Sequence, residues 1–230
     1  MASSTFLELL KQLSTNRLLV LKDRVEGEHK FIPIDLSTQN SDLSHVNLAS
    51  SEDLNNYIQA YLDTAQADVA YGGYLEVRQL YQRSSYFNAG DVATERNIHL
   101  GIDFWCDAGT PVCAILEGEV HSFKNNTNYG DYGPTIILKH RFFGVEFFTL
   151  YGHLSLASIT NLKVGQKFVG GAVLGTLGDA TVNGDYPPHL HFQIIKDIQD
   201  YSGDYPGVAS KTDLEFYKTN CPDPNVLLRL

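Results

Sequence analysis

Residues 98–105 read IHLGIDFW, and they begin a series of short apolar runs that fills the second half of the chain. The later runs are PVCAIL (111–116), GEVHSF (118–123), PTIILKH (134–140), EFFTLYGHL (146–154), AVLGTLG (172–178) and HLHFQII (189–195). Glycine, proline, asparagine or aspartate separates one run from the next. Short apolar or alternating runs between turn-forming residues are typical of antiparallel strands, so this region is predicted to be a mainly β domain.

The first third of the chain carries two helical patterns. Phe6, Leu9, Leu10 and Leu13 recur at helical spacing, as do the apolar residues of segment 54–62. Ser50 and Asp53 precede the second pattern as a capping box. Between the helices, RLLVLKD (17–23) and KFIPIDLS (30–37) are candidate short strands. We therefore expect a small α+β extension at 1–85, the β domain at 86–200, and an irregular tail at 201–230 that packs on it.

The composition limits the possible partners. The chain of 230 residues has 17 Lys and Arg against 27 Asp and Glu, a formal net charge of −10. Nucleic-acid binding is not expected, because it depends on basic residues that neutralise phosphates. The three cysteines are too few and too scattered for a disulfide framework.

The N-terminal sequence predicts the compartment. It has no basic n-region, and its longest apolar run, LLVL, is too short for a signal peptide or a membrane span. We therefore expect a cytoplasmic protein without membrane insertion, although export is possible if a leader has been removed.

The histidines divide into two groups. His29, His45 and His121 have no partner motif and are expected at the surface, whereas His140 is expected to make a structural hydrogen bond. The other four histidines, at 99, 153, 189 and 191, stand in motifs that fit metal or proton chemistry.

His99 and Asp103 are four residues apart in HLGID. On a regular strand that spacing places them about 13 Å apart, at ~3.3 Å per residue, which is too far for one metal ion. For both residues to bind one ion, the backbone would have to bulge out of a regular strand, and Gly101 is the residue that would permit it.

The motif PPHLHFQ holds His189 and His191, which lie on one face of a strand about 7 Å apart. One of them can bind a metal while the other works beside it. His153 ends a predicted strand in LYGHLS, directly after a glycine.

Taken together, HLGIDFWCDAGTPVCAILEGEV, GPTIILKH, LYGHLS, LKVGQKFVGGAVLGTLG and PPHLHFQI resemble the lysostaphin-type (LytM-type) zinc endopeptidases, which cut peptide cross-bridges of bacterial cell walls. The resemblance spans roughly residues 90 to 197. It implies an antiparallel β-sandwich or barrel-sandwich catalytic domain. The sequence departs from the usual family pattern at Pro187 and Gln193.

The resemblance also implies a role for each motif residue. His99, Asp103 and His191 match the zinc ligands, and water would take the fourth position, as in catalytic zinc sites. His153 and His189 match the two histidines that serve as general base, general acid and oxyanion stabiliser. An upstream asparagine, Asn88 or Asn97, is a candidate for the residue that caps the metal in latent relatives.

The predicted function is therefore a zinc metallopeptidase. It would hydrolyse peptidoglycan-like or small glycine-containing peptides with a metal-activated water. The alternative is a non-catalytic metal- or peptide-binding regulatory module of the same fold. LKVGQKFVGGAVLGTLG (162–178) also reads as a hairpin like those of biotin or lipoyl carriers, but Lys163 and Lys167 are not in the setting that carriers need.

Overall fold

The computed structural model describes residues 3–14, 19–22, 28–85, 87 and 94–230. The helices are α1 (Ser3–Leu13), α2 (Ser51–Ala65), α3 (Leu156–Ile159), α4 (Leu214–Asn220) and α5 (Asn225–Leu228), with 3-10 turns η1 (Ser41–His45) and η2 (Leu80–Arg83). The strands are β1 (Phe31–Pro33), β2 (Val69–Gly72), β3 (Ile98–His99), β4 (Ile102–Trp105), β5 (Pro111–Cys113), β6 (Gly118–Asn126), β7 (Gly133–Phe142), β8 (Val145–Gly152), β9 (Lys167–Phe168), β10 (Val173–Thr176), β11 (His189–Ile195) and β12 (Val208–Ala209). Strands account for 30% of the residues and helices for 23%, which confirms the mainly β prediction.

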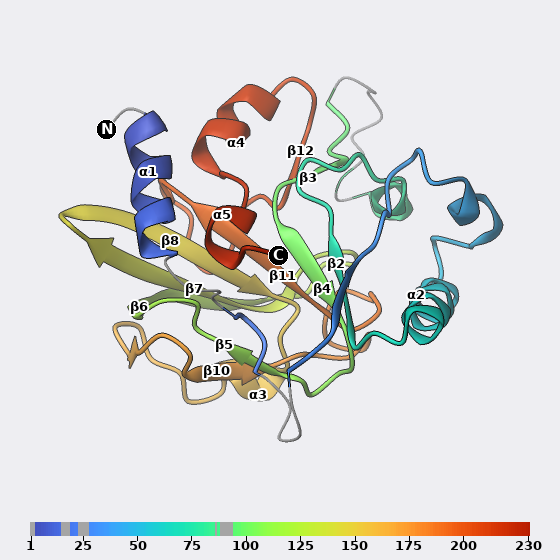
Figure 1. Ribbon diagram of the computed structural model, residues 1–230, viewed down its shortest axis with the longest axis horizontal. Coiled ribbons are helices and arrows are strands. Elements are labelled where there is room, and N and C mark those ends of the chain that lie inside the picture. The colour runs from blue at the N-terminus through green and yellow to red at the C-terminus, as the bar shows by residue number, and fades with distance from the viewer. Residues whose placement is uncertain (1–2, 15–18, 23–27, 86, 88–93) are drawn as a thin grey trace.

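One eight-stranded sheet organises the molecule, in the order β1-β2-β4-β11-β8-β7-β6-β9. Its pairs are antiparallel except β1 with β2, and two small sheets pair β10 with β5 and β12 with β3. The central strands are β4, β11 and β8, which places the HLGID and HLH motifs side by side (Figure 1). The order of the strands therefore positions the candidate site.

The two faces of this sheet carry different residues because side chains alternate along a strand. On β11, Leu190, Phe192 and Ile194 belong to the largest apolar core, which α1 and α5 cover (Figure 1). His189 and His191 point to the opposite face. That face is packed by α2 at one end and by the C-terminal segment at the other. The candidate site therefore lies between two smaller apolar clusters.

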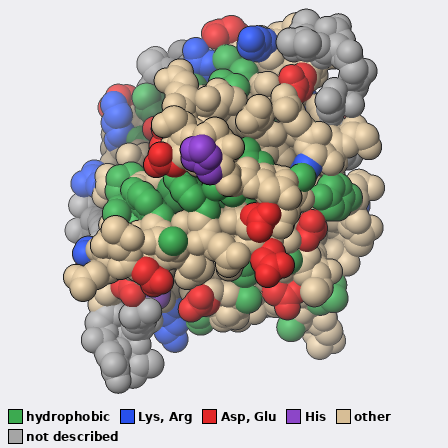
Figure 2. Space-filling view, turned by 90° about the vertical axis from the view of Figure 1, so that its right-hand side faces the viewer, with side chains coloured by type: hydrophobic (Ala, Val, Ile, Leu, Met, Phe, Trp, Pro, Cys, Tyr) green, Lys and Arg blue, Asp and Glu red, His purple; other side chains and the backbone are tan. Residues whose placement is uncertain are grey.

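The two predicted N-terminal helices are confirmed. The hydroxyl of Ser50 accepts a hydrogen bond from the backbone N–H of Asp53 at 3.1 Å and caps α2. The buried side of α2 packs on β1 and β2, and its exposed side includes Glu52, Asp53 and Asp63. Figure 2 shows this acidic face of the molecule.

The strand prediction for KFIPIDLS is confirmed by β1. Of the candidate strand at 17–23, Leu21 forms an isolated bridge with Val112, and residues 17, 18 and 23 lie outside the described part of the chain. β1 and β2 join the sheet of the β domain directly. The proposed division at residue 85 stays a prediction.

Two local predictions are wrong. Segment 162–178 does not pair with itself as a hairpin, because β9 pairs with β6 and β10 pairs with β5. The tail 201–230 is not irregular, since it forms β12, α4 and α5. These elements have only two to seven residues, which is too short for a hydrophobic period to show. Among the described helices, none is long and apolar enough to cross a membrane.

Candidate metal centre

His99, Asp103 and His191 come together from three different strands. His99 ends β3, Asp103 lies in β4, and His191 lies opposite Asp103 in β11. The strand is interrupted between β3 and β4 at Leu100 and Gly101, as predicted from the spacing of His99 and Asp103. A Cβ atom at Gly101 would lie 2.6 Å from the carbonyl oxygen of Phe192 and 2.7 Å from the His191 ring, so only glycine allows this approach.

Three acceptor atoms meet at the centre of this cluster. His99 Nε2 lies 2.9 Å from His191 Nδ1, and Asp103 Oδ1 lies 3.2 Å and 3.1 Å from these two nitrogens. Around a tetrahedral zinc ion with bonds of about 2.0–2.1 Å, ligand atoms are about 3.3 Å apart. The spacing of the three atoms therefore fits a small divalent cation.

Hydrogen bonds on the far side of each ring determine which nitrogen carries the proton. His99 Nδ1–H donates to the Gly73 carbonyl at 3.0 Å, and His191 Nε2–H donates to Gln193 Oε1 at 2.9 Å. The Gln193 amide is oriented in turn, because its Nε2 donates to the carbonyl of Pro206 at 3.1 Å. Both imidazoles therefore direct a lone pair at the centre, beside a carboxylate oxygen. A cation relieves the repulsion among such a donor set, and this second shell is typical of metal-binding histidines.

Arg78 holds the other oxygen of the Asp103 carboxylate. The Arg78 side chain is 2% exposed, and its NH1 donates to Asp103 Oδ2 while its Nε donates to Glu76 Oε2, both at 2.5 Å. Burial alone would raise the pKa of Asp103, but its electrostatic interactions with the His99 ring and the Arg78 guanidinium hold that pKa well below its usual range. Asp103 is therefore an anion with one oxygen left for a metal.

His153 and His189 lie beside the cluster, with ring centroids 4.1 Å apart. His153 Nδ1–H donates to the Asn183 carbonyl and His189 Nδ1–H donates to the Pro187 carbonyl, each at 2.8 Å. Each ring therefore keeps a lone pair on Nε2. Burial lowers the pKa of His189 to about 4. Burial, and next the electrostatic coupling to the His189 ring, lower the pKa of His153. In the absence of a metal, both rings are neutral proton acceptors at neutral pH.

The backbone also contributes to the placement of His153. This residue adopts φ = 61°, which is rare outside glycine, and its N–H donates to the Tyr132 carbonyl at 2.9 Å. The left-handed turn at the end of β8 directs the ring toward the cluster. Such strained positions are characteristic of functional sites.

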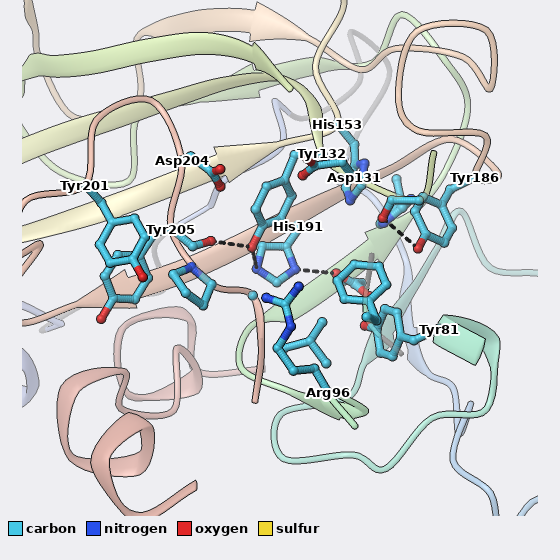
Figure 3. A pocket seen from close by; sticks show the side chains of 17 residues that line it. Tyr81, Arg96, Asp131, Tyr132, His153, Tyr186, His191, Tyr201, Asp204 and Tyr205 are labelled. Atoms are coloured by element: carbon cyan, nitrogen blue, oxygen red, sulfur yellow. Dashed lines mark hydrogen bonds and ion pairs between the residues drawn. The ribbon is translucent and has the colours of Figure 1, made fainter. Parts of the chain in front are cut away.

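A cavity of about 150 Å³ opens above these residues (Figure 3). Asp103, His153, His189 and His191 all line it, and each is 5% exposed or less. Five tyrosines, at 81, 132, 186, 201 and 205, form much of the wall. The five site residues predicted from the sequence thus form one cluster, and the cavity gives a small molecule access to it. Their individual roles stay predictions.

Sequence reasoning missed Arg78, Glu76 and the orienting role of Gln193. In YLEVRQLY, charged Glu76 and Arg78 alternate with apolar residues. This was the only available sign that the two side chains share one face of an extended segment, because no motif links them to Asp103. Of the two candidate capping asparagines, Asn88 lies outside the described residues. Asn97 Oδ1 is buried without a hydrogen-bond partner in the described part of the chain. The structural hydrogen bond predicted for His140 is confirmed, with the Glu117 carbonyl at 2.7 Å.

Comparison with known proteins gives a consistent picture. Residues 97–202 match the model of peptidase family M23. The DD-carboxypeptidase/endopeptidase Mpg of Neisseria meningitidis serogroup B is 38% identical over 96 residues, which are 42% of this chain and 20% of that protein. The glycyl-glycine endopeptidase ALE-1 of Staphylococcus capitis is 36% identical over 95 residues, 41% of this chain and 24% of that protein.

A solved structure resembles the same region. The catalytic domain of lysostaphin from Staphylococcus simulans has 30% sequence identity, covers 53% of this chain and 80% of its own, and superposes with a TM-score of 0.37. The chain spans about a fifth of the length of the first curated relatives that it matches.

Proposed function

Because residues 97–202 of this chain belong to peptidase family M23, we propose that the chain is a zinc-dependent endopeptidase. Its substrates are peptidoglycan-like or small glycine-containing peptides, whose peptide bonds it hydrolyses with water. The names of two relatives, a DD-carboxypeptidase/endopeptidase and a glycyl-glycine endopeptidase, support a peptide bond as the target.

One observation carries this proposal: the donor set of the metal centre. His99, Asp103 and His191 present two lone pairs and one carboxylate oxygen, 2.9–3.2 Å apart. Three protein ligands of this type leave one position open, which is the arrangement of catalytic zinc sites rather than structural ones. We assign these residues as the zinc ligands.

The chemistry follows from the two neighbouring histidines. Zinc at this site would lower the pKa of water to about 7 and polarise a carbonyl oxygen. His189 or His153 accepts the proton of the attacking water on its free Nε2 as the oxygen bonds to the carbonyl carbon. The C–N bond then breaks, and the imidazolium returns the same proton to the leaving nitrogen. The other histidine takes up a separate proton from solvent on Nε2, and in that form it can donate to the oxyanion.

Metal exchange tests the proposal. The chain is dialysed against a chelator, refilled with one equivalent of Zn²⁺, and assayed by mass spectrometry on pentaglycine and on a cross-bridge peptide. We expect no hydrolysis without metal and recovery after refilling. His189→Ala should lower the rate by roughly 10²–10⁴-fold, whereas His45→Ala, an exposed position, should not change it.

The alternative function has its own outcome in this assay. A chain that binds zinc stoichiometrically but hydrolyses none of these peptides would be a regulatory module rather than an enzyme. The closely spaced proton acceptors on His153 and His189 favour the enzyme, because a binding module has no need of them.

A further inference from the structure

The cavity above the metal centre is closed in part by residues that lie outside the family match. Tyr81, Phe87 and Arg96 precede residue 97, while the lining residues Asp204 to Val208 follow residue 202. In Figure 3, Tyr201 and Tyr205 lie on one side of His191, and Tyr81 and Tyr186 lie on the opposite side. The flanking segments therefore contribute Tyr205 to one wall of the site and Tyr81 to the opposite wall.

The C-terminal wall is fixed against the metal ligands. Residue 100 donates its N–H to the Gly207 carbonyl at 2.9 Å, and Val208 pairs with His99 as β12 joins β3. Tyr132 donates its hydroxyl hydrogen to the Tyr205 carbonyl at 3.1 Å. A Cβ atom at Gly207 would lie 1.8 Å from the Tyr132 hydroxyl and 3.2 Å from His191 Nε2. The backbone of this wall thus lies directly against a metal ligand.

The N-terminal wall is held from two sides. Arg83 lies 4.1 Å above the Tyr186 ring and donates to the Asp185 carbonyl at 2.5 Å. Ser84 donates its hydroxyl to the carbonyl of Tyr129 at 2.6 Å. These contacts join the η2 region to the loops before β7 and before β11. These contacts therefore fix the position of the N-terminal wall relative to the β domain.

Among the described residues that line the cavity, the more exposed ones form a rim near Tyr201. Tyr201, at 40% exposure, is the most open of the large lining residues, and the lining residues Arg96, Asp204 and Pro206 are half-buried. The cavity of about 150 Å³ is smaller than the roughly 300–1,000 Å³ of pockets for drug-sized ligands. A cavity of this size, with walls on two sides of His191, leaves little room for a long polymer strand to continue past the metal centre.

We propose that the substrate is a short soluble peptide, a few residues long, that enters end-on through the rim at Tyr201. Its scissile bond lies near one end of the molecule. This inference rests on the proposed peptidase function and narrows its substrates from wall polymer to free peptides or released wall fragments.

The test compares substrates of different size that contain the same peptide bonds. The zinc-loaded full chain is given intact cross-linked sacculi, the soluble fragments released from them by a glycan-cutting enzyme, and free peptides of two to about six residues. New amino groups are counted per available bond. We expect cleavage of free peptides at least 100-fold faster than that of intact sacculi, with a rate that falls as the peptide lengthens.

A binding measurement adds a readout that does not depend on turnover. Zinc-loaded His189→Ala protein is titrated with a short peptide by calorimetry and sedimented with sacculi. Heat of binding to the peptide and recovery of the protein in the supernatant support the inference.

The outcomes separate the two proposals. Cleavage of sacculi at a rate per bond like that of free peptides overturns this inference and leaves the peptidase function standing. No cleavage of any substrate removes the peptidase function and this inference with it. Tyr201→Ala should raise the ratio of sacculus to peptide cleavage, and Phe216→Ala, at 48% exposure outside the cavity, should not. An unchanged ratio in Tyr201→Ala would overturn the rim as the barrier.

Discussion

Replacement of Arg78 by lysine should weaken zinc binding without unfolding the protein. Lysine keeps the positive charge, so the electrostatic effect on Asp103 is largely retained. It loses the planar fork through which Arg78 contacts Asp103 Oδ2 and Glu76 Oε2 at 2.5 Å each. The lysine nitrogen cannot reproduce both contacts, and the Asp103 carboxylate gains freedom to rotate away from the two histidines.

The size of the effect follows from the position of Arg78 behind a metal ligand. Loss of such an outer contact typically weakens metal binding by about 10–100-fold, or about 1.4–2.7 kcal/mol. The more drastic Arg78→Met would remove the cation that the Asp103 and Glu76 carboxylates share, at a cost of about 3–5 kcal/mol, which threatens the fold itself. Lysine is therefore the informative substitution.

The dissociation constant is measured by competition with a chromophoric zinc chelator at fixed pH. Thermal unfolding of the metal-free proteins shows whether each variant is folded. Arg141→Lys is the matched control, because its ion pair with Glu146 is on the surface and its side chain is 71% exposed. A folded Arg78→Lys protein that binds zinc as tightly as the unaltered chain would refute the positioning role of Arg78.

Three further predictions concern other buried groups. Gln193→Leu removes the acceptor that orients His191, so zinc affinity measured by chelator competition should fall about 10–100-fold; an unchanged affinity would contradict this. Gly207→Ala introduces a Cβ atom 1.8 Å from the Tyr132 hydroxyl, so the free energy of unfolding in urea should fall by about 1–3 kcal/mol. In the control Gly170→Ala, the new Cβ atom meets only ordinary contacts at 3.5 Å, and the free energy of unfolding should stay the same. Burial lowers the pKa of His140 to about 4, so the unfolded chain takes up a proton there that the folded chain excludes. The contribution of neutral His140 to the free energy of unfolding is therefore complete above pH 6.5 and is lost as the pH falls to about 4. Between pH 6.5 and 4, the free energy of unfolding of the metal-free protein should therefore fall by up to about 3 kcal/mol more than that of His140→Gln, as measured by urea unfolding at each pH. Equal decreases in the two proteins would exclude the effect.

The sequence was sufficient to predict the class of fold, and the resemblance of its motifs named the five residues that the structure brings together. Strand and helix patterns depend on local alternation and capping, and both can be read from neighbouring residues. The prediction that the chain must break at Gly101 needed only the rise of a strand and the length of a metal bond. For this reason His99 and Asp103 were correctly expected to approach each other.

The surroundings of the site were decided by tertiary structure alone. Arg78 is 25 positions from Asp103 and Gln193 is followed by a tail that seemed irregular, so no local pattern connects them to the metal centre. The cavity walls include residues from both sides of the family match, Tyr81, Phe87 and Arg96 before it and Asp204 to Val208 after it. β12 has only two residues and is too short to be recognised before it pairs with β3. Motif residues are recognisable because their chemistry restricts residue type and spacing. Contacts between distant segments depend on how the whole chain packs, and that packing is visible only in the folded molecule.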